Sequence, residues 1–185
     1  TGAVAVNGGT VNLGGKSILN FVTIAGGTLT GGSFDVAKLI ANSGTISAVL
    51  TGSAGLTTTG NVALNAANTF TGTVNVTAGT VTLGNAAALG STANALNVGA
   101  TGTVDVNGQA VTVSGLTGSG ALTGSAGSSV TLGGAADATF SGSIGGATSL
   151  SKTGAGNQTL SSASTFSGGT SVTGGTITVG DNAAL

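Results

Sequence analysis

Residues 61–89 read NVALNAANTFTGTVNVTAGTVTLGNAAAL, and residues 157–185 read NQTLSSASTFSGGTSVTGGTITVGDNAAL. The two stretches align without gaps at an offset of 96, so that Leu64 matches Leu160. Apolar positions are kept and polar positions vary, as expected where the apolar residues line a core. The chain is therefore built from internal repeats, and repeats of this kind are typical of stacked architectures.

Within each copy, short alternating segments are separated by glycines. Segments such as Val74-Asn75-Val76 place apolar side chains on one side of a strand and polar ones on the other. Glycine, of which the chain has 37, supplies the positive φ that sharp corners need. The stretch from Leu64 to Leu83 has a suitable length for one turn of a coil. We predict an all-β chain, a right-handed parallel β-helix (β-solenoid) with short strands, Gly-rich corners and about nine coils.

A second internal match relates residues 1–13 to residues 101–113, at an offset of 100. We predict a single β-solenoid over 1–185, made of two degenerate superrepeats of roughly 1–89 and 90–185. With strands ~4.8 Å apart, its rod would be on the order of 40 Å long. Because the sequence begins at Thr1 without Met, we expect an excerpt or a subunit of a longer array.

The composition disfavours several classes of protein. Charged residues make up 4% of the chain, whereas an ordinary soluble domain has about 25%. The hydrophobic fraction of 39% and the net charge of −1 argue against disorder. Three scattered lysines and no arginine cannot bind nucleic acid through its phosphates. No apolar run approaches the ~18 residues of a transmembrane segment.

Catalytic and metal-binding residues are not evident. The chain has no His, Cys or Glu, and its four aspartates, Asp35, Asp105, Asp137 and Asp181, lie far apart in sequence. We therefore predict a non-enzymatic protein with no catalytic, cofactor-binding or metal residues, and no cofactor.

Two short motifs imitate known sites. Gly14-Gly15-Lys16-Ser17 resembles the end of a phosphate-binding loop, but Thr10 stands where that loop needs its first glycine, so we expect a Gly-rich corner. Ser149-Leu150-Ser151-Lys152 followed by Thr153-Gly154 imitates two penicillin-binding motifs. One lysine would have to serve both, so we interpret the match as coincidence.

Phenylalanines and threonines also recur in shared contexts. Phe70, Phe140 and Phe166 each lie in a Thr-Phe-(Thr/Ser)-Gly context, and we expect core packing, with stacking along the rod interior as one arrangement. Exposed aromatics for sugar binding are the alternative. Thr-x-Thr recurs irregularly at 28–30, 71–73, 80–82, 101–103 and 176–178, so ice binding is a weaker alternative than ordinary outward threonines.

The stretch from Ala138 resembles the autotransporter-associated β-strand repeat, also called the passenger-associated transport repeat. The matching parts are Thr139-Phe140-Ser141-Gly142, Lys152-Thr153-Gly154-Ala155-Gly156, Thr165-Phe166-Ser167-Gly168-Gly169-Thr170 and Gly175-Thr176-Ile177-Thr178-Val179-Gly180. Residues 60–89 fit its second half. The resemblance implies a β-helical passenger of a Gram-negative surface protein, secreted through a C-terminal membrane barrel, and it supplies no catalytic residues.

Three functions follow as hypotheses. The first is a structural rod, stalk or fibre, secreted or at the Gram-negative cell surface, which self-associates head to tail because open solenoid ends expose unpaired strand edges. The second is a surface adhesin passenger that binds host or cell-surface glycans. The third is an ice-binding protein.

Overall fold

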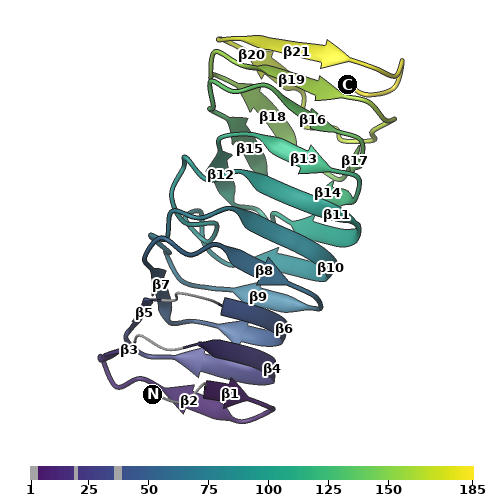
Figure 1. The fold of residues 1–185 in the computed structure, drawn as a ribbon. Helices are drawn as coiled ribbons and strands as arrows, with labels where there is room; N and C mark the ends of the chain where they lie inside the picture. Colours follow the sequence, from purple (N-terminus) through teal and green to yellow (C-terminus); the bar gives the residue numbers. More distant parts are fainter. Residues whose placement is uncertain (1–3, 19–20, 36–38) are drawn as a thin grey trace.

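The computed structural model describes residues 4–18, 21–35 and 39–185. The regular secondary structure in these ranges consists of β-strands alone. The chain winds in turns that stack along one axis, from β1 (Val4–Val6) at one end to β21 (Thr176–Val179) at the other (Figure 1). Nothing in these ranges forms a helix suited by length and apolar character to span a membrane. The described residues therefore form a rod, whose two ends are the first and the last turn of the stack.

Each turn has up to three sides, which we call faces, and all paired strands are parallel. Face 1 carries β1, β8 (Leu56–Thr58), β13 (Leu116–Gly118), β16 (Ala138–Phe140), β19 (Asn157–Leu160) and β21. Face 2 carries β2 (Thr10–Asn12), β9 (Val62–Leu64), β14 (Ala121–Thr123) and β17 (Ser143–Ile144). Four longer strands run over both: β4 (Val22–Thr30), β6 (Leu39–Ile46), β10 (Val74–Leu83) and β11 (Leu96–Asp105).

Face 3 closes the coil and is made of two separate sheets. The first contains β3 (Ser17–Ile18), β5 (Ser33–Asp35) and β7 (Val49–Thr51). The second contains β12 (Ala110–Val113), β15 (Ser129–Leu132), β18 (Ser149–Lys152) and β20 (Thr170–Val172). Faces 1, 2 and 3 follow one another in that order along the chain in each turn.

The register on face 1 counts the turns. The length of a turn varies along the rod, since Asn42 and Thr59 are 17 residues apart and Asn75 and Asn97 are 22 residues apart. One file of inward residues pairs neighbour to neighbour along the rod: Val6, Ile24, Ala41, Thr58, Val76, Val98, Gly118, Phe140, Leu160 and Val179. The predicted parallel β-helix of about nine coils is thus confirmed.

The turn length predicted from the repeat is confirmed as well. Leu64 pairs with Leu83 in the next turn, and Leu160 pairs with Val179. The two copies of the repeat therefore take the same length of chain for one turn.

Burial explains why the turns stack. Along β10 the residues alternate between buried and partly exposed, and Val74, Val76, Val81 and Leu83 are fully buried. Each such side chain contributes ~1.5–3 kcal/mol on transfer from water, but only where a neighbouring turn covers it. Stability therefore accumulates from turn to turn. Nine steps of ~4.8 Å give a rod of about 43 Å.

The corner between faces 1 and 2 requires glycine. Gly44 has φ +123°, and a Cβ at this position would overlap the carbonyl oxygen of Gly27 in the turn below. A Cβ at Gly27 would in turn meet Gly9 and Val6. Turns of chain stack so closely here that a side chain has no room, which accounts for the glycines that recur at this corner.

Two buried asparagines bond to the backbone in the part of face 3 that lies between its two sheets. Asn68 accepts a hydrogen bond from the backbone N–H of Leu50 and donates one to the carbonyl oxygen of Ala88. Asn94 donates to the carbonyl oxygens of Phe70 and Leu89. The side-chain amides thus pair backbone groups in the turns between β7 and β12, where face 3 carries no strand.

The repeat copies lie on different faces. In the first copy β9 and the second half of β10 lie on face 2, whereas their counterparts at an offset of 96, β19 and β21, pair on face 1. At an offset of 100 the change is opposite. Val4 lies on face 1 and its counterpart Val104 lies on face 2, where it pairs with Leu122. The shorter offset therefore covers five turns less one face, and the longer one covers five turns plus one face.

Candidate functional site

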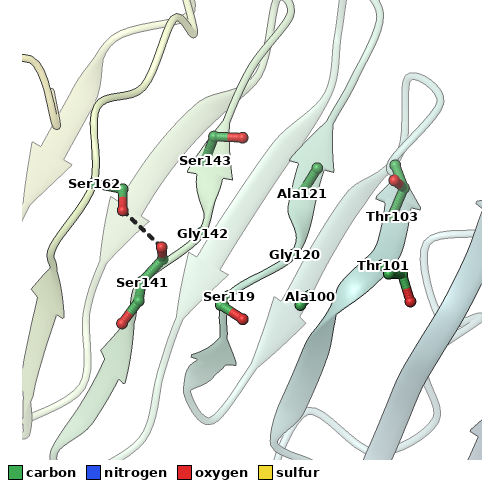
Figure 2. Close-up of a pocket in the computed structure, with 11 residues that line it drawn as sticks. Ala100, Thr101, Thr103, Ser119, Gly120, Ala121, Ser141, Gly142, Ser143 and Ser162 are labelled. Atoms are coloured by element: carbon green, nitrogen blue, oxygen red, sulfur yellow. Dashed lines mark hydrogen bonds between the residues drawn. The ribbon is translucent and has the colours of Figure 1, made fainter.

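A shallow groove follows the corner between faces 1 and 2 across four turns. It has a volume of about 380 Å³ and is lined by Ala100, Thr101, Gly102, Thr103, Ser119, Gly120, Ala121, Ser141, Gly142, Ser143 and Ser162. Glycines of successive turns lie at its centre, and they stack closely, since a Cβ on Gly142 would overlap the carbonyl oxygen of Gly120. Figure 2 shows the small side chains of successive turns lying side by side along it.

The chemistry of the groove is that of neutral hydroxyl and backbone groups. The hydroxyl of Ser162 donates to the carbonyl oxygen of Ser141 at 2.6 Å (Figure 2). The lining contains no charged and no aromatic side chain. Such a surface can exchange hydrogen bonds with a hydroxylated ligand, but it provides neither a nucleophile activated by a base nor a stacking platform. Sequence reasoning missed this groove, because its residues are ordinary corner residues in the sequence.

The phosphate-loop imitation is a corner. Gly14 and Gly15 have φ of +57° and +76°, and the backbone N–H of Lys16 donates to the carbonyl oxygen of Leu13 at 3.0 Å. The chain continues into strand β3 rather than into a helix. No helix N-terminus is therefore available in this part of the described chain to bind phosphate, in agreement with the predicted Gly-rich corner.

The segment that imitates the penicillin-binding motifs forms β18, a strand whose inward side chains lie in the core. Leu150 and Lys152 point inward from β18, where they are 2% and 3% exposed. Lys152 pairs between Leu132 and Val172 in neighbouring turns, and its ammonium group donates to the carbonyl oxygen of Gly154. A buried lysine in the rod interior was not foreseen from the sequence. The alternation along residues 149–152 is the signal that places it inward.

The described aspartates bond to backbone: Asp105 and Asp181 each cap a local turn, and Asp137 bonds to the next turn of the solenoid. Oδ1 of Asp105 accepts from the backbone N–H of Asn107, Oδ1 of Asp137 from that of Asn157, and Oδ1 of Asp181 from that of Ala183. Each lies in a different turn, and the described residues contain no group of three or more potential metal ligands. The side chain of Asp35 lies outside the described set. The absence of site residues stays a prediction.

The phenylalanines of the shared context pack against the core, as expected. Phe70 and Phe140 are 1% and 0% exposed, and Phe166 is partly buried against the core. They do not form one stack. Phe70 follows Leu50 on face 3, Phe140 lies on face 1, and the segment around Phe166 bonds to face 2 at Ile144. The shift of the repeat copies between faces explains why equivalent residues are not aligned.

The Thr-x-Thr motifs are also dispersed. Those at 28–30, 80–82 and 101–103 lie on face 2, and the one at 176–178 lies on face 1. Thr80 and Thr103 pair in adjacent turns, but the other motifs are separated by turns without one. The described residues therefore present no continuous Thr-x-Thr array of the kind that the ice-binding hypothesis needs.

Among the described residues, most of the exposed large hydrophobic side chains lie at the C-terminal end of the rod. The largest exposures of big hydrophobic side chains are at Phe21, Val172, Val179 and Leu185, and three of these four belong to the last turns. Val172 and Val179 continue inward files whose previous members, Lys152 and Leu160, are buried. Within residues 1–185 no later turn lies over these two side chains. The outer edges of β20 and β21 are open for the same reason.

Comparison with known families agrees with this architecture. The model of the passenger-associated transport repeat matches residues 59–83 and 150–179. The first match contains β9 and β10, and the second contains most of β18 and all of β19, β20 and β21. Both matches coincide with the repeat copies that the sequence comparison finds, so the predicted resemblance is confirmed.

A curated relative extends the similarity over nearly the whole chain. The adhesin BmaC autotransporter of Brucella suis biovar 1 (strain 1330) is 37% identical to this chain over an alignment of 186 residues. The alignment covers 94% of this chain. The chain spans 5% of the length of that relative. No solved structure matches. The chain therefore belongs to the proteins that contain the passenger-associated transport repeat.

Proposed function

We propose that the chain is a structural segment of an autotransporter passenger, exposed on a Gram-negative cell surface or released from it, and that it acts as a rigid rod. The observation that carries the proposal is the unbroken file of paired residues from Val6 to Val179. Because each turn is bonded to its neighbours by parallel backbone ladders, the rod resists bending and holds what lies beyond it at a fixed distance.

The rod is suited to extension through its ends. Val172 and Val179 are 50% and 46% exposed at the C-terminal end, beside the open edges of β20 and β21. Another turn of chain placed there would cover both side chains and pair both edges. Neither chemistry nor a cofactor enters this role, and we propose a non-enzymatic function.

Small-angle scattering of the purified chain tests the rod. The expected result is an elongated particle with a long axis of about 43 Å plus side chains, which fits stacked turns. In a passenger displayed on cells, an epitope placed beyond one added copy of the chain should move outward by a further ~45 Å. A compact, isotropic particle, or an epitope that stays at the same height, would contradict the proposal.

Adhesion is the second candidate, because the relative carries the name of an adhesin and the groove in Figure 2 offers hydroxyl groups along four turns. The proposed ligand is a cell-surface glycan. A glycan array probed with the chain and with a variant in which Ser119, Ser141 and Ser162 are alanine tests it. Binding that the variant loses would favour adhesion through the groove, and an array without hits would remove this candidate.

A further inference from the structure

We propose that the C-terminal end is a docking surface for a following copy of this chain, reached through an eleven-residue connector that itself becomes a strand on face 3. The inference rests on the proposed rod and specifies its junction. It commits to the order of the strands at that junction and to the residues that they cover.

The first argument is the phase of the repeats. The offset of 96 covers five turns less one face, and the offset of 100 covers five turns plus one face. Taken together, the two offsets make ten whole turns. Their total exceeds the 185 residues of the chain by eleven, so eleven more are needed before the next copy begins in phase. A spacing that returns each strand to its own face is what a continuous rod requires.

The second argument is the identity of those eleven residues. In the first copy, residues 90–100 follow Leu89 and lead into the segment that matches the start of the chain. Their strand, Leu96-Asn97-Val98, pairs with Val74-Asn75-Val76 on face 1. The counterpart of Val74-Asn75-Val76 in the second copy is Thr170-Ser171-Val172, which is β20 on face 3. A connector of the same type would therefore pair with β20.

The third argument is that this is the strand the last turn lacks. After β21 on face 1, the backbone of Ala183 accepts a hydrogen bond from Ser164, which continues face 2, and the described chain reaches Leu185 without a further strand on face 3. Val172 is 50% exposed beneath that position. A connector strand would place its valine, the counterpart of Val98, on Val172, because Val98 lies on Val76 in the first copy.

The next strand then falls on β21. In the first copy Val104 pairs with Val81. Its counterpart at the start of the following copy is Val4, and the counterpart of Val81 is Ile177. Val4 of the following copy would thus lie on Ile177, and its Val6 would lie on Val179. Because Val6 is the first residue of the inward file on face 1, the file of one copy would continue directly into that of the next. Two copies stacked without a connector would cover Val179 but leave face 3 open above Val172.

Thiol labelling distinguishes these arrangements, because the chain has no cysteine and a single one can report. The protein to be tested carries residues 1–185, then a second copy of residues 90–100, then a second complete chain. Val172→Cys and Val179→Cys are made separately in the first unit. We expect labelling of both cysteines to slow at least about tenfold relative to the same variants of the single chain, since a covering strand must open first.

Three controls make the result specific. Thr139→Cys, exposed on the outer side of β16, should label equally fast in the single and the tandem protein. An eleven-residue Gly/Ser connector should leave Cys at 172 as reactive as in the single chain. An equimolar free second chain should also leave it reactive. Unchanged labelling at 172 in the tandem protein, or equal protection with the Gly/Ser connector, would overturn the proposal.

Scattering on the same tandem protein separates this outcome from a failure of the proposed function. A rod that lengthens by about 48 Å while position 172 stays reactive would keep the rod and reject the connector strand. A single chain that is not elongated would reject the rod itself.

Discussion

The side-chain amide of Gln158 pairs with the backbone of Leu116 two turns away. Its Oε1 accepts from the N–H of Leu116 at 3.1 Å, and its Nε2 donates to the carbonyl oxygen of the same residue at 2.8 Å. Between them lies β16, which pairs with β13 at Phe140 and Gly118. Gln158 thus supplies, from inside the rod, the bonds that a neighbouring strand makes elsewhere in the ladder.

Replacing Gln158 with leucine should therefore destabilise the rod although leucine is apolar. The N–H and carbonyl groups of Leu116 would stay buried without partners, at ~1–3 kcal/mol each, so we expect a loss of roughly 2–4 kcal/mol in the free energy of unfolding. Urea unfolding followed by circular dichroism measures it. Gln109→Leu is the matched control, since Gln109 is partly exposed and should change stability by less than about 0.5 kcal/mol. Equal effects of the two substitutions would contradict the bridging role.

The glycine corner gives a second prediction. Gly142→Ala places a methyl group on the carbonyl oxygen of Gly120, and we expect a loss of about 1–3 kcal/mol because the turns must move apart. Gly133 has no atom closer than 3.6 Å to an added Cβ, so Gly133→Ala serves as the control and should be neutral or stabilising by up to about 1 kcal/mol. The midpoint of urea unfolding ranks the three proteins, and a Gly142 variant as stable as the control would show that the turns stack less closely.

The interior phenylalanines give a third. Phe140 is fully buried, and Phe140→Ala should cost ~3–5 kcal/mol by loss of contacts and creation of a cavity. Phe21 is 55% exposed, so Phe21→Ala should change stability by about 0.5 kcal/mol or less. Thermal or urea unfolding compares them. A larger effect at Phe21 than at Phe140 would place the core on the wrong side of the strands.

Several features were predictable from residue patterns. The turn length follows from the spacing of Leu64 and Leu83, and the core residues follow from alternation around Val74 and Val81. These patterns are local, and each reports its own burial. The high glycine content also predicted that the corners between strands are rich in glycine.

Other features were not predictable, for physical reasons. A Val-x-Val segment looks the same on any of three faces, so the sequence match of Leu64 with Leu160 says nothing about the change of face between them. Alternation places Gln158 on the inward side, two residues before Leu160. Its bonds to Leu116 could not be predicted, because they depend on the irregular pairing of β16 in the neighbouring turn. The face on which a strand lies, and the place where a side chain must bond to unpaired backbone, both depend on the lengths of the loops between strands. The alternation of apolar and polar residues does not encode these lengths.

The stacking of turns into a rod is the central claim, and a distance between two outward residues on face 1 tests it most directly. Thr23 in β4 and Thr178 in β21 each stand one residue before a member of the inward file on face 1, Ile24 and Val179. They lie eight turns apart. Spin labels on Thr23→Cys and Thr178→Cys should give a narrow distribution centred near ~38 Å, with allowance for the label arms, because each turn adds ~4.8 Å. A broad distribution, or one centred below about 25 Å, would contradict a continuous solenoid.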